Sequence, residues 1–402
     1  MLTRQSYRAA MQRIHHSRST VSRATVLALL GTACGGGTPD ADPVVRADSA
    51  GIEIVRNPPA DEELAWEFER EWSIGGSADE RLAVSELAPF HVATDGAERV
   101  YVLEEDARRV IVVSAAGAVL DTLGSPGDGP GELGSPSAIA VDDNGSVSVY
   151  DYGRGGLVRW SATGEPLDFL RVDARFWGPG IAVTDAGVVF TALAGEGAGT
   201  SSQRLAVWSP EADRTLVPFE RMPDRLADFP TCGFGGLPVP PLFAPELVWY
   251  ARGSRVVVNV DASYVLDLFD EGRLVRSIRR DLEPLPVDRG MALREVGEGL
   301  PIPVANCTVP PDEVVRGRGY ADVLPSVRRV VLSPEGDIWV LRGHVAGEPI
   351  RIDVFAADGA YRGTVRPDVP FPVAFLGAER MVVIEPDAMD APRLAAWRIR
   401  RP

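Results

Sequence analysis

The glycines of Gly124–Glu132, GSPGDGPGE, are the residues that could hold a phosphate group. A glycine-rich loop binds phosphate when it leads into a helix, because the first amide groups of the helix face the anion. This loop instead precedes an apolar run, Ala138–Val141, with the length and composition of a strand. All 41 basic residues are arginine, so the chain has neither a P-loop lysine nor a Schiff-base lysine. We therefore interpret the glycines as a tight turn between strands.

Groups for acid–base and nucleophilic chemistry are sparse. Beyond residue 33 the histidines are His91 and His344. The sequence contains no GxSxG nucleophile elbow and no recognisable Ser/His/Asp set. We interpret both histidines as polar residues beside strands, and His344, in the loop LRGHVAGEP, as the better placed to face a ligand.

The N-terminus predicts export. Residues 1–33 contain five arginines and no acidic residue, and the apolar run ATVLALL precedes the small residues Gly31, Thr32 and Ala33. This is the pattern of a signal peptide, too short to span a bilayer. The run ending at Cys34 resembles the bacterial lipobox, although Gly31 stands where leucine is usual. The resemblance implies that Cys34 is acylated and becomes the mature N-terminus, on the periplasmic side or at the cell surface; a plain cleaved signal is the alternative.

Cys232 and Cys307 are the other cysteines, and in an exported protein such a pair predicts a disulfide. Two unpaired buried thiols are the alternative. The chain has no CxxC motif and no Cys/His cluster of the kind that binds zinc.

Charge limits the partners. The net charge is −16, and without residues 1–33 the remaining 36 arginines face 57 acidic residues, a net charge of −21. Such a body repels nucleic acid and anionic membranes, so we expect no nucleic-acid partner and membrane contact only through a lipid anchor. A solvated surface that keeps the protein soluble is the simplest interpretation of this charge.

The main part of the chain consists of sequence repeats. After a predicted flexible tether, residues 34–51, the chain from about Pro89 has short β-branched or aromatic runs separated by Gly, Pro, Asp and Asn. The runs group into six units of about 40 residues, each with four strands, which predicts an all-β, six-bladed β-propeller over residues 52–402. We expect Ala65–Gly76 to pair with the last blade and close the ring, and Gly51–Asn57 to form an extra strand.

The stretch Gly124–Glu165 resembles an NHL repeat of exported bacterial six-bladed propellers. Residues that carry the resemblance are Gly129–Glu132 before the blade, Asp142 and Gly145 in the first turn, and Asp151 in the second strand. It extends over about residues 66–402. The fold hosts many activities, so the resemblance is a poor guide to function.

Two enzyme types occur among such propellers. Zinc lyases of this type use three histidines, and the two available here cannot supply that site. Gluconolactonase-like propellers hold calcium with Glu, Asp and Asn, but Asn144 fits a turn and Asn259 alone does not complete a ligand set. We therefore expect no cofactor and retain a calcium-dependent hydrolase or a lyase as the alternative function.

The leading hypothesis is a binding or interaction module for a protein, peptide or carbohydrate ligand. Two insertions, Arg221–Pro245 and Asp288–Pro325, interrupt the repeat and each carries one of the two body cysteines. We expect the disulfide to tie them together over one mouth of the ring, near Arg154 and His344, as binding loops or as stapled decoration. The ligand-binding candidates in the loops between second and third strands are Arg108, Tyr152, Arg154, Arg342 and His344.

If Cys34 is the lipidated residue, mass spectrometry of the mature protein will show an acylated N-terminal cysteine at this position. Cys34→Ser will release the protein in soluble form, because the lipid is its only predicted anchor. An unmodified mature chain that starts at another residue would exclude lipidation at Cys34.

Overall fold

The structure is a computed structural model that describes residues 44–82, 84, 86–172, 176–194, 202–302 and 306–402. The chain divides into two units, 1–40 and 41–402, and the second contains every described residue. The predicted signal peptide and Cys34 lie outside the described residues. None of the described helices is both long enough and apolar enough to span a membrane.

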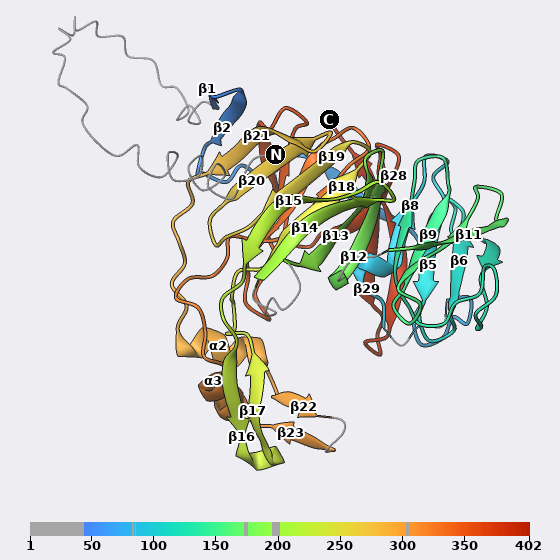
Figure 1. Cartoon of the computed structure of the whole chain (residues 1–402). Coiled ribbons are helices and arrows are strands. Elements are labelled where there is room, and N and C mark those ends of the chain that lie inside the picture. The colour runs from blue at the N-terminus through green and yellow to red at the C-terminus, as the bar shows by residue number, and fades with distance from the viewer. Residues whose placement is uncertain (1–43, 83, 85, 173–175, 195–201, 303–305) are drawn as a thin grey trace, which may run out of the picture. The chain divides into compact units, whose positions relative to one another are not determined.

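Six antiparallel sheets follow the predicted repeat and form the blades (Figure 1). Blades one to three comprise β4 (Val92–Thr94), β5 (Val100–Glu104), β6 (Arg109–Val113) and β7 (Val119–Leu123); β8 (Pro136–Val141), β9 (Val147–Asp151), β10 (Gly156–Trp160) and β11 (Pro166–Arg171); and β12 (Phe176–Thr184), β13 (Gly187–Leu193), β14 (Ser202–Ser209) and β15 (Ala212–Glu220). Blades four to six comprise β18 (Val248–Arg252), β19 (Arg255–Asn259), β20 (Val265–Asp270) and β21 (Arg273–Arg280); β24 (Val327–Leu332), β25 (Ile338–Arg342), β26 (Ile352–Phe355) and β27 (Tyr361–Val365); and β28 (Pro372–Leu376), β29 (Arg380–Pro386), β30 (Pro392–Arg400) and β3 (Glu67–Gly75).

The blades form a closed ring. Each innermost strand contacts the innermost strands of both neighbouring blades, in the cyclic order β4, β8, β12, β18, β24, β28 and back to β4. Apolar side chains pack between neighbouring blades, as where Trp339 of blade five meets Phe375 of blade six with ring centroids 5.4 Å apart. The predicted six-bladed propeller is confirmed by this strand pairing.

The residues that resemble the NHL pattern hold turns and loops. Gly145 has a φ of 89°, which glycine tolerates, and the Asp142 carboxylate accepts the N–H of Ser146 across the same turn. The fully buried Asp151 accepts backbone N–H groups from the loop ahead of the blade, at 2.7 Å from Gly134. In the glycine-rich loop, Glu132 accepts the N–H of Gly129 at 2.7 Å, so this turn is bonded within itself.

The N-terminal chain runs along the outer edges of blades four, five and six. β3 is the outermost strand of blade six and pairs with β30, as predicted for Ala65–Gly76. β2 (Ile52–Asn57) is the predicted extra strand and adds to blade four, parallel to β21. Between them, Leu64 N donates to Thr364 O of blade five at 2.9 Å. We call residues 45–64 the N-terminal strap.

The predicted boundary between the flexible tether and the folded body is wrong, because part of the strap lies within the predicted tether. β1 (Val45–Ser49) lies within the stretch 34–51 that we expected to be flexible, but it pairs antiparallel with β2. Ala50 and Gly51 both have positive φ, 56° and 82°, and make the two-residue turn that such a hairpin needs. Arg46 in β1 also forms an ion pair of 2.6 Å with Asp358 of blade five.

The two insertions fold together as a small lobe. The first, between blades three and four, forms the hairpin of β16 (Arg225–Phe229) and β17 (Phe234–Val239); the second, between blades four and five, forms α2 (Arg289–Val296), β22 (Leu300–Ile302), β23 (Cys307–Val309) and α3 (Pro311–Arg318). Figure 1 shows these elements gathered together, and Phe229 and Val314 pack in their shared core. The predicted disulfide joins Cys232 to Cys307 with Cα atoms 5.8 Å apart. We call these residues, 225–239, 289–302 and 306–318, the insertion lobe.

Candidate functional site

The strand order places the insertion lobe and one set of loops at the same mouth of the ring. Strands one and three of a blade run opposite to strands two and four, so connections between blades and loops between second and third strands share one end. Gly343 N in such a loop donates to Ser326 O in such a connection at 3.1 Å. We call this end the insertion mouth and the other end, with the tight turns, the turn mouth.

Two cavities meet at the insertion mouth. The first, about 390 Å³, lies between the insertion lobe and blades four and five. The second, about 670 Å³, is the central channel lined by the innermost strands. The cavities share Arg221, Glu246, Val248 and Arg328, and both volumes are in the range of small-molecule sites. The two cavities therefore adjoin each other beside the lobe.

Contacts of α2 fix the lobe side of this space. Glu295 accepts the N–H of Ala346 at 2.9 Å and lies 3.5 Å from Arg328. Arg294 pairs with Glu348 at 3.2 Å, in the same loop of blade five that contains His344. Described contacts therefore join the lobe to the His344 loop.

Charges divide the channel into two ends. At the insertion mouth its lining contains Arg221, Arg328 and Arg329 against Glu246. At the turn mouth the charged lining residues are Asp142, Asp143, Asp185 and Arg252. The channel is thus positive beside the lobe and negative at its far end, although the body as a whole is strongly acidic.

Arg329 stands out among these cations. It lies on the innermost strand β24 and lines the channel. Its side chain has no hydrogen bond or ion pair among the residues that the structure describes. Partial desolvation in the channel, with the neighbouring charge of Arg328, lowers the pKa of its guanidinium. Arg329 is exposed to solvent, as is Arg328, so its guanidinium is in contact with water and its donors are available to a ligand.

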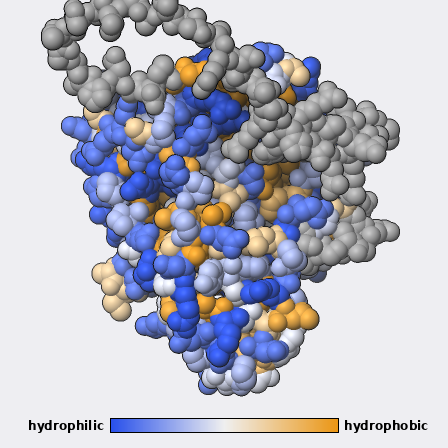
Figure 2. Space-filling model, turned by 90° about the vertical axis from the view of Figure 1, so that its left-hand side faces the viewer, coloured by the Kyte–Doolittle hydropathy of each residue, from blue (hydrophilic) through white to orange (hydrophobic). Residues whose placement is uncertain are grey.

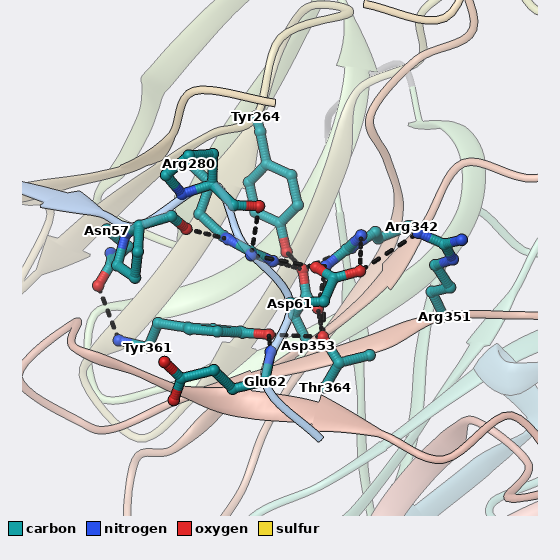
Figure 3. Close-up of polar contacts among 12 residues, drawn as sticks. Asn57, Asp61, Glu62, Tyr264, Arg280, Arg342, Arg351, Asp353, Tyr361 and Thr364 are labelled. Carbon is teal, nitrogen blue, oxygen red and sulfur yellow. Dashed lines mark hydrogen bonds and ion pairs between the residues drawn. The ribbon is translucent and has the colours of Figure 1, made fainter. Parts of the chain in front are cut away.

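Arg342, a predicted ligand residue, is instead part of a buried ion-pair network (Figure 3). Its Nε and Nη2 atoms donate to the two carboxylate oxygens of Asp353, both at 2.7 Å, and Nη2 also pairs with Asp61. Burial favours the neutral guanidine, but the hydrogen bonds that Arg342 donates to Asp353 and Asp61 raise its pKa. Its donors are committed to internal partners, which corrects the expectation that it faces a ligand.

The network joins blades four and five to the N-terminal strap. Asp353, which is fully buried, also accepts from Arg280 at 2.8 Å and from the hydroxyl of Tyr264 at 2.6 Å. Arg280 lies 4.0 Å from the ring centre of Tyr361 and donates to Ala60 O of the strap at 2.8 Å. Figure 3 shows these side chains converging on Asp353 from different segments. The buried carboxylate of Asp353 therefore compensates two buried arginines, and the partly exposed Asp61 pairs with both of them as well.

The other predicted ligand residues occupy different settings. Arg154 donates to Glu132 O at 3.0 Å and lies over Phe169 at 4.4 Å, so it braces its own blade. Arg108 and Tyr152 are exposed, Tyr152 by 72%. His344 is half-buried, with Nδ1 3.1 Å from Arg342 O. Among the five predicted ligand residues, His344 lies in the loop that contacts the insertion lobe.

The residues that line the insertion mouth were missed in the sequence. Arg328 and Arg329 form the pair VRRVV in an otherwise apolar innermost strand, which is the signal that could have identified them. Asn259, considered as a calcium ligand, instead donates its amide to Ser263 O and Val265 O, both at 2.9 Å. Within the described ranges, no three His, Cys, Asp or Glu side chains are grouped closely enough to hold a metal ion.

Comparison with known proteins adds distant structural similarity. No family model matches the chain, and no curated protein matches it. A candidate exported protein from Bacteroides fragilis is 12% identical, covers 87% of this chain and 100% of its own, and gives a TM-score of 0.49. A member of the DUF4221 family from Bacteroides vulgatus is 9% identical, with coverage of 85% and 100% and a TM-score of 0.49. A gluconolactonase from Xanthomonas campestris is 14% identical, with coverage of 89% and 100% and a TM-score of 0.37. The fold assignment stands on the strand pairing, and these similarities carry no inference about function.

Replacing Asp353 by asparagine will destabilise the protein by about 3–5 kcal/mol in chemical denaturation, because Arg280 and Arg342 lose their shared buried carboxylate. Glu69→Gln is the control, since it breaks an exposed pair with Arg400 and should cost about 1 kcal/mol or less. Equal losses in the two variants would contradict the structural role of the network.

The network also gives stability a pH dependence. Burial opposes ionisation of Asp61, but hydrogen bonds and charge from Arg342 and Arg280 outweigh it and lower the pKa of this carboxyl in the folded state. A lowered folded pKa adds stability that is present above the unfolded value, about 3.9, and is lost as the pH falls below it. Asp61→Asn should therefore flatten the acid limb of a stability-against-pH curve.

Proposed function

We propose that this protein is an exported, lipid-anchored β-propeller that binds a ligand in the adjoining cavities at its insertion mouth. The observation that carries the proposal is the junction of the two cavities at Arg221, Glu246, Val248 and Arg328. Blades four and five supply one wall of the first cavity and the insertion lobe supplies the other. A cavity with apolar walls and a few convergent charges is the usual form of a ligand site.

The disulfide supports both the compartment and the site. Disulfides persist in oxidising compartments outside the cytoplasm, as expected for an exported protein. The two cysteines are 75 residues apart in the sequence. A disulfide that closes a loop of this length stabilises a fold by about 4–5 kcal/mol in the chain-entropy model. Because Cys232 and Cys307 lie on different insertions, the bond holds the two parts of the lobe together. A fixed lobe keeps its wall of the cavity in place before the ligand arrives, which reduces the ordering cost of binding.

The surface visible in Figure 2 is mainly hydrophilic, with hydrophobic side chains in separate patches. Such a surface suits a protein in contact with water, with recognition confined to a cavity. A peptide, a carbohydrate or a segment of a partner protein could enter the insertion mouth. The alternative of a calcium-dependent hydrolase or a lyase gains no support from any grouping of metal-binding side chains in the described ranges.

Filling the first cavity will abolish binding. Ala244 lines it, so Ala244→Trp places an indole in the ligand space, whereas Ala116→Trp adds the same group to an exposed turn of blade one. Short peptides and oligosaccharides can be screened by their effect on the thermal unfolding midpoint. Compounds that raise the midpoint of the unmodified protein should act on Ala116→Trp but not on Ala244→Trp. Compounds that act equally on both variants would place binding elsewhere.

A further inference from the structure

We propose that the arginine end of the channel, formed by Arg221, Arg328 and Arg329, binds the carboxylate of a ligand whose apolar part fills the cavity beside the insertion lobe. This inference rests on the proposed function and names the chemical class of the ligand. It follows from the unused hydrogen-bonding capacity of these arginines, from their charge, and from the apolar walls next to them.

The three guanidinium groups retain donors for a ligand. The exposed side chain of Arg329 has no hydrogen bond or ion pair within the described part of the chain. Arg221 donates from Nη2 to Asp224 at 2.7 Å, but its buried Nε has no partner among the described residues. Arg328 is 3.5 Å from Glu295, a long contact for a charged pair. A carboxylate accepts two parallel N–H groups from an arginine, which matches these free donors.

The electrostatics favour a single anionic group. Arg328 and Arg329 are adjacent in the sequence and both are exposed to solvent; partial desolvation in the channel and the neighbouring charge of Arg328 lower the pKa of Arg329. An anion beside them would relieve this repulsion and stabilise the charged form. The rest of the body is acidic, so a polyanion such as nucleic acid would be repelled by the surface around the mouth. A ligand with a single carboxylate pairs with the local positive charge and is repelled much less by the acidic surface around it.

The walls beside the arginines select an apolar body for the ligand. The first cavity carries aliphatic, proline and aromatic side chains from the connections that lead from the lobe into blades four and five; these are Pro240, Pro241, Leu242, Phe243, Leu324 and Pro325. The guanidinium of Arg318, also in the lining, donates to Pro240 O at 3.0 Å and so is held against this wall. A ligand with an apolar body and a terminal carboxylate would bury its apolar body against these residues. Its carboxylate would then point toward Arg328 and Arg329.

The test uses N-acetyl-trileucine with a free C-terminal carboxylate, its C-terminal amide, and octanoate. Titration calorimetry should show the acid binding at least tenfold more tightly than the amide, as expected for one charge-assisted contact. Arg329→Gln should remove this preference by weakening the acid alone. Arg289→Gln is the control: this exposed arginine of α2 pairs with Asp312 outside both cavities, and its loss should leave the preference intact. Competition by octanoate would show that a carboxylate on an alkyl chain suffices, and its absence would assign the site to peptide carboxylates.

Equal binding of acid and amide would overturn the inference, as would an acid preference that survives in Arg329→Gln. If such equal binding is lost in Ala244→Trp, the proposed cavity stands and only its ligand class is wrong. If it persists in Ala244→Trp, the proposed function fails as well. If neither peptide binds, the carboxylate inference is also wrong. The screen of peptides and oligosaccharides against Ala244→Trp would then test separately whether the cavity binds any ligand.

Discussion

The buried carboxylate of Asp353 is the interaction on which the seam between blades four and five depends. Two buried arginines, Arg280 and Arg342, must each find a negative partner there; they share this fully buried one, and Asp61 of the strap is a second partner of both. Leaving either cation unpaired in the interior would cost several kcal/mol, so the network forms as a unit. Since Arg280 also holds backbone oxygens of the strap and Arg342 pairs with Asp61, the same network fixes the N-terminal chain.

The position of the strap has consequences for the whole ring. A six-bladed ring needs its last blade completed by a strand from the other end of the chain, and β3 does this after the strap has passed blades four and five. Closure fixes the spacing of the innermost strands and therefore the width of the channel. Blades four and five also carry the wall opposite the insertion lobe. The network that holds their seam thus supports the proposed binding site, without contacting a ligand itself.

The repeat made much of the fold predictable. Four strands per unit, turns such as DDNG, and a lone strand ahead of the first unit were enough to infer six blades and ring closure, because alternation and turn residues are local signals. The disulfide followed from export and from the position of Cys232 and Cys307 in separate insertions. The β1 strand was missed because its turn, Ala50–Gly51, lies within a stretch that reads as polar linker.

Most of the candidate site could not be predicted, because it depends on contacts between distant residues. Arg342 looked like a ligand residue in its loop, yet its partner Asp61 lies 281 positions away in the sequence. Local patterns do not show which side chains find such internal partners. The reverse holds for Arg329: only the closed ring shows that it faces the channel and has no partner within the described residues. The residue types suggested that arginines recognise the ligand. The fold determined which arginine side chains have donors that no other protein group uses.

Hydrogen–deuterium exchange tests the central claim, that a ligand binds at the insertion mouth, most directly. Exchange would be compared with and without a compound that raises the unfolding midpoint of the unmodified protein. The account predicts slower exchange at residues 246–250 and 327–330, where the two cavities join, and unchanged exchange at the turns around residues 142–145 and 252–254. Protection confined to those turns at the other mouth, with none at the junction, would contradict it.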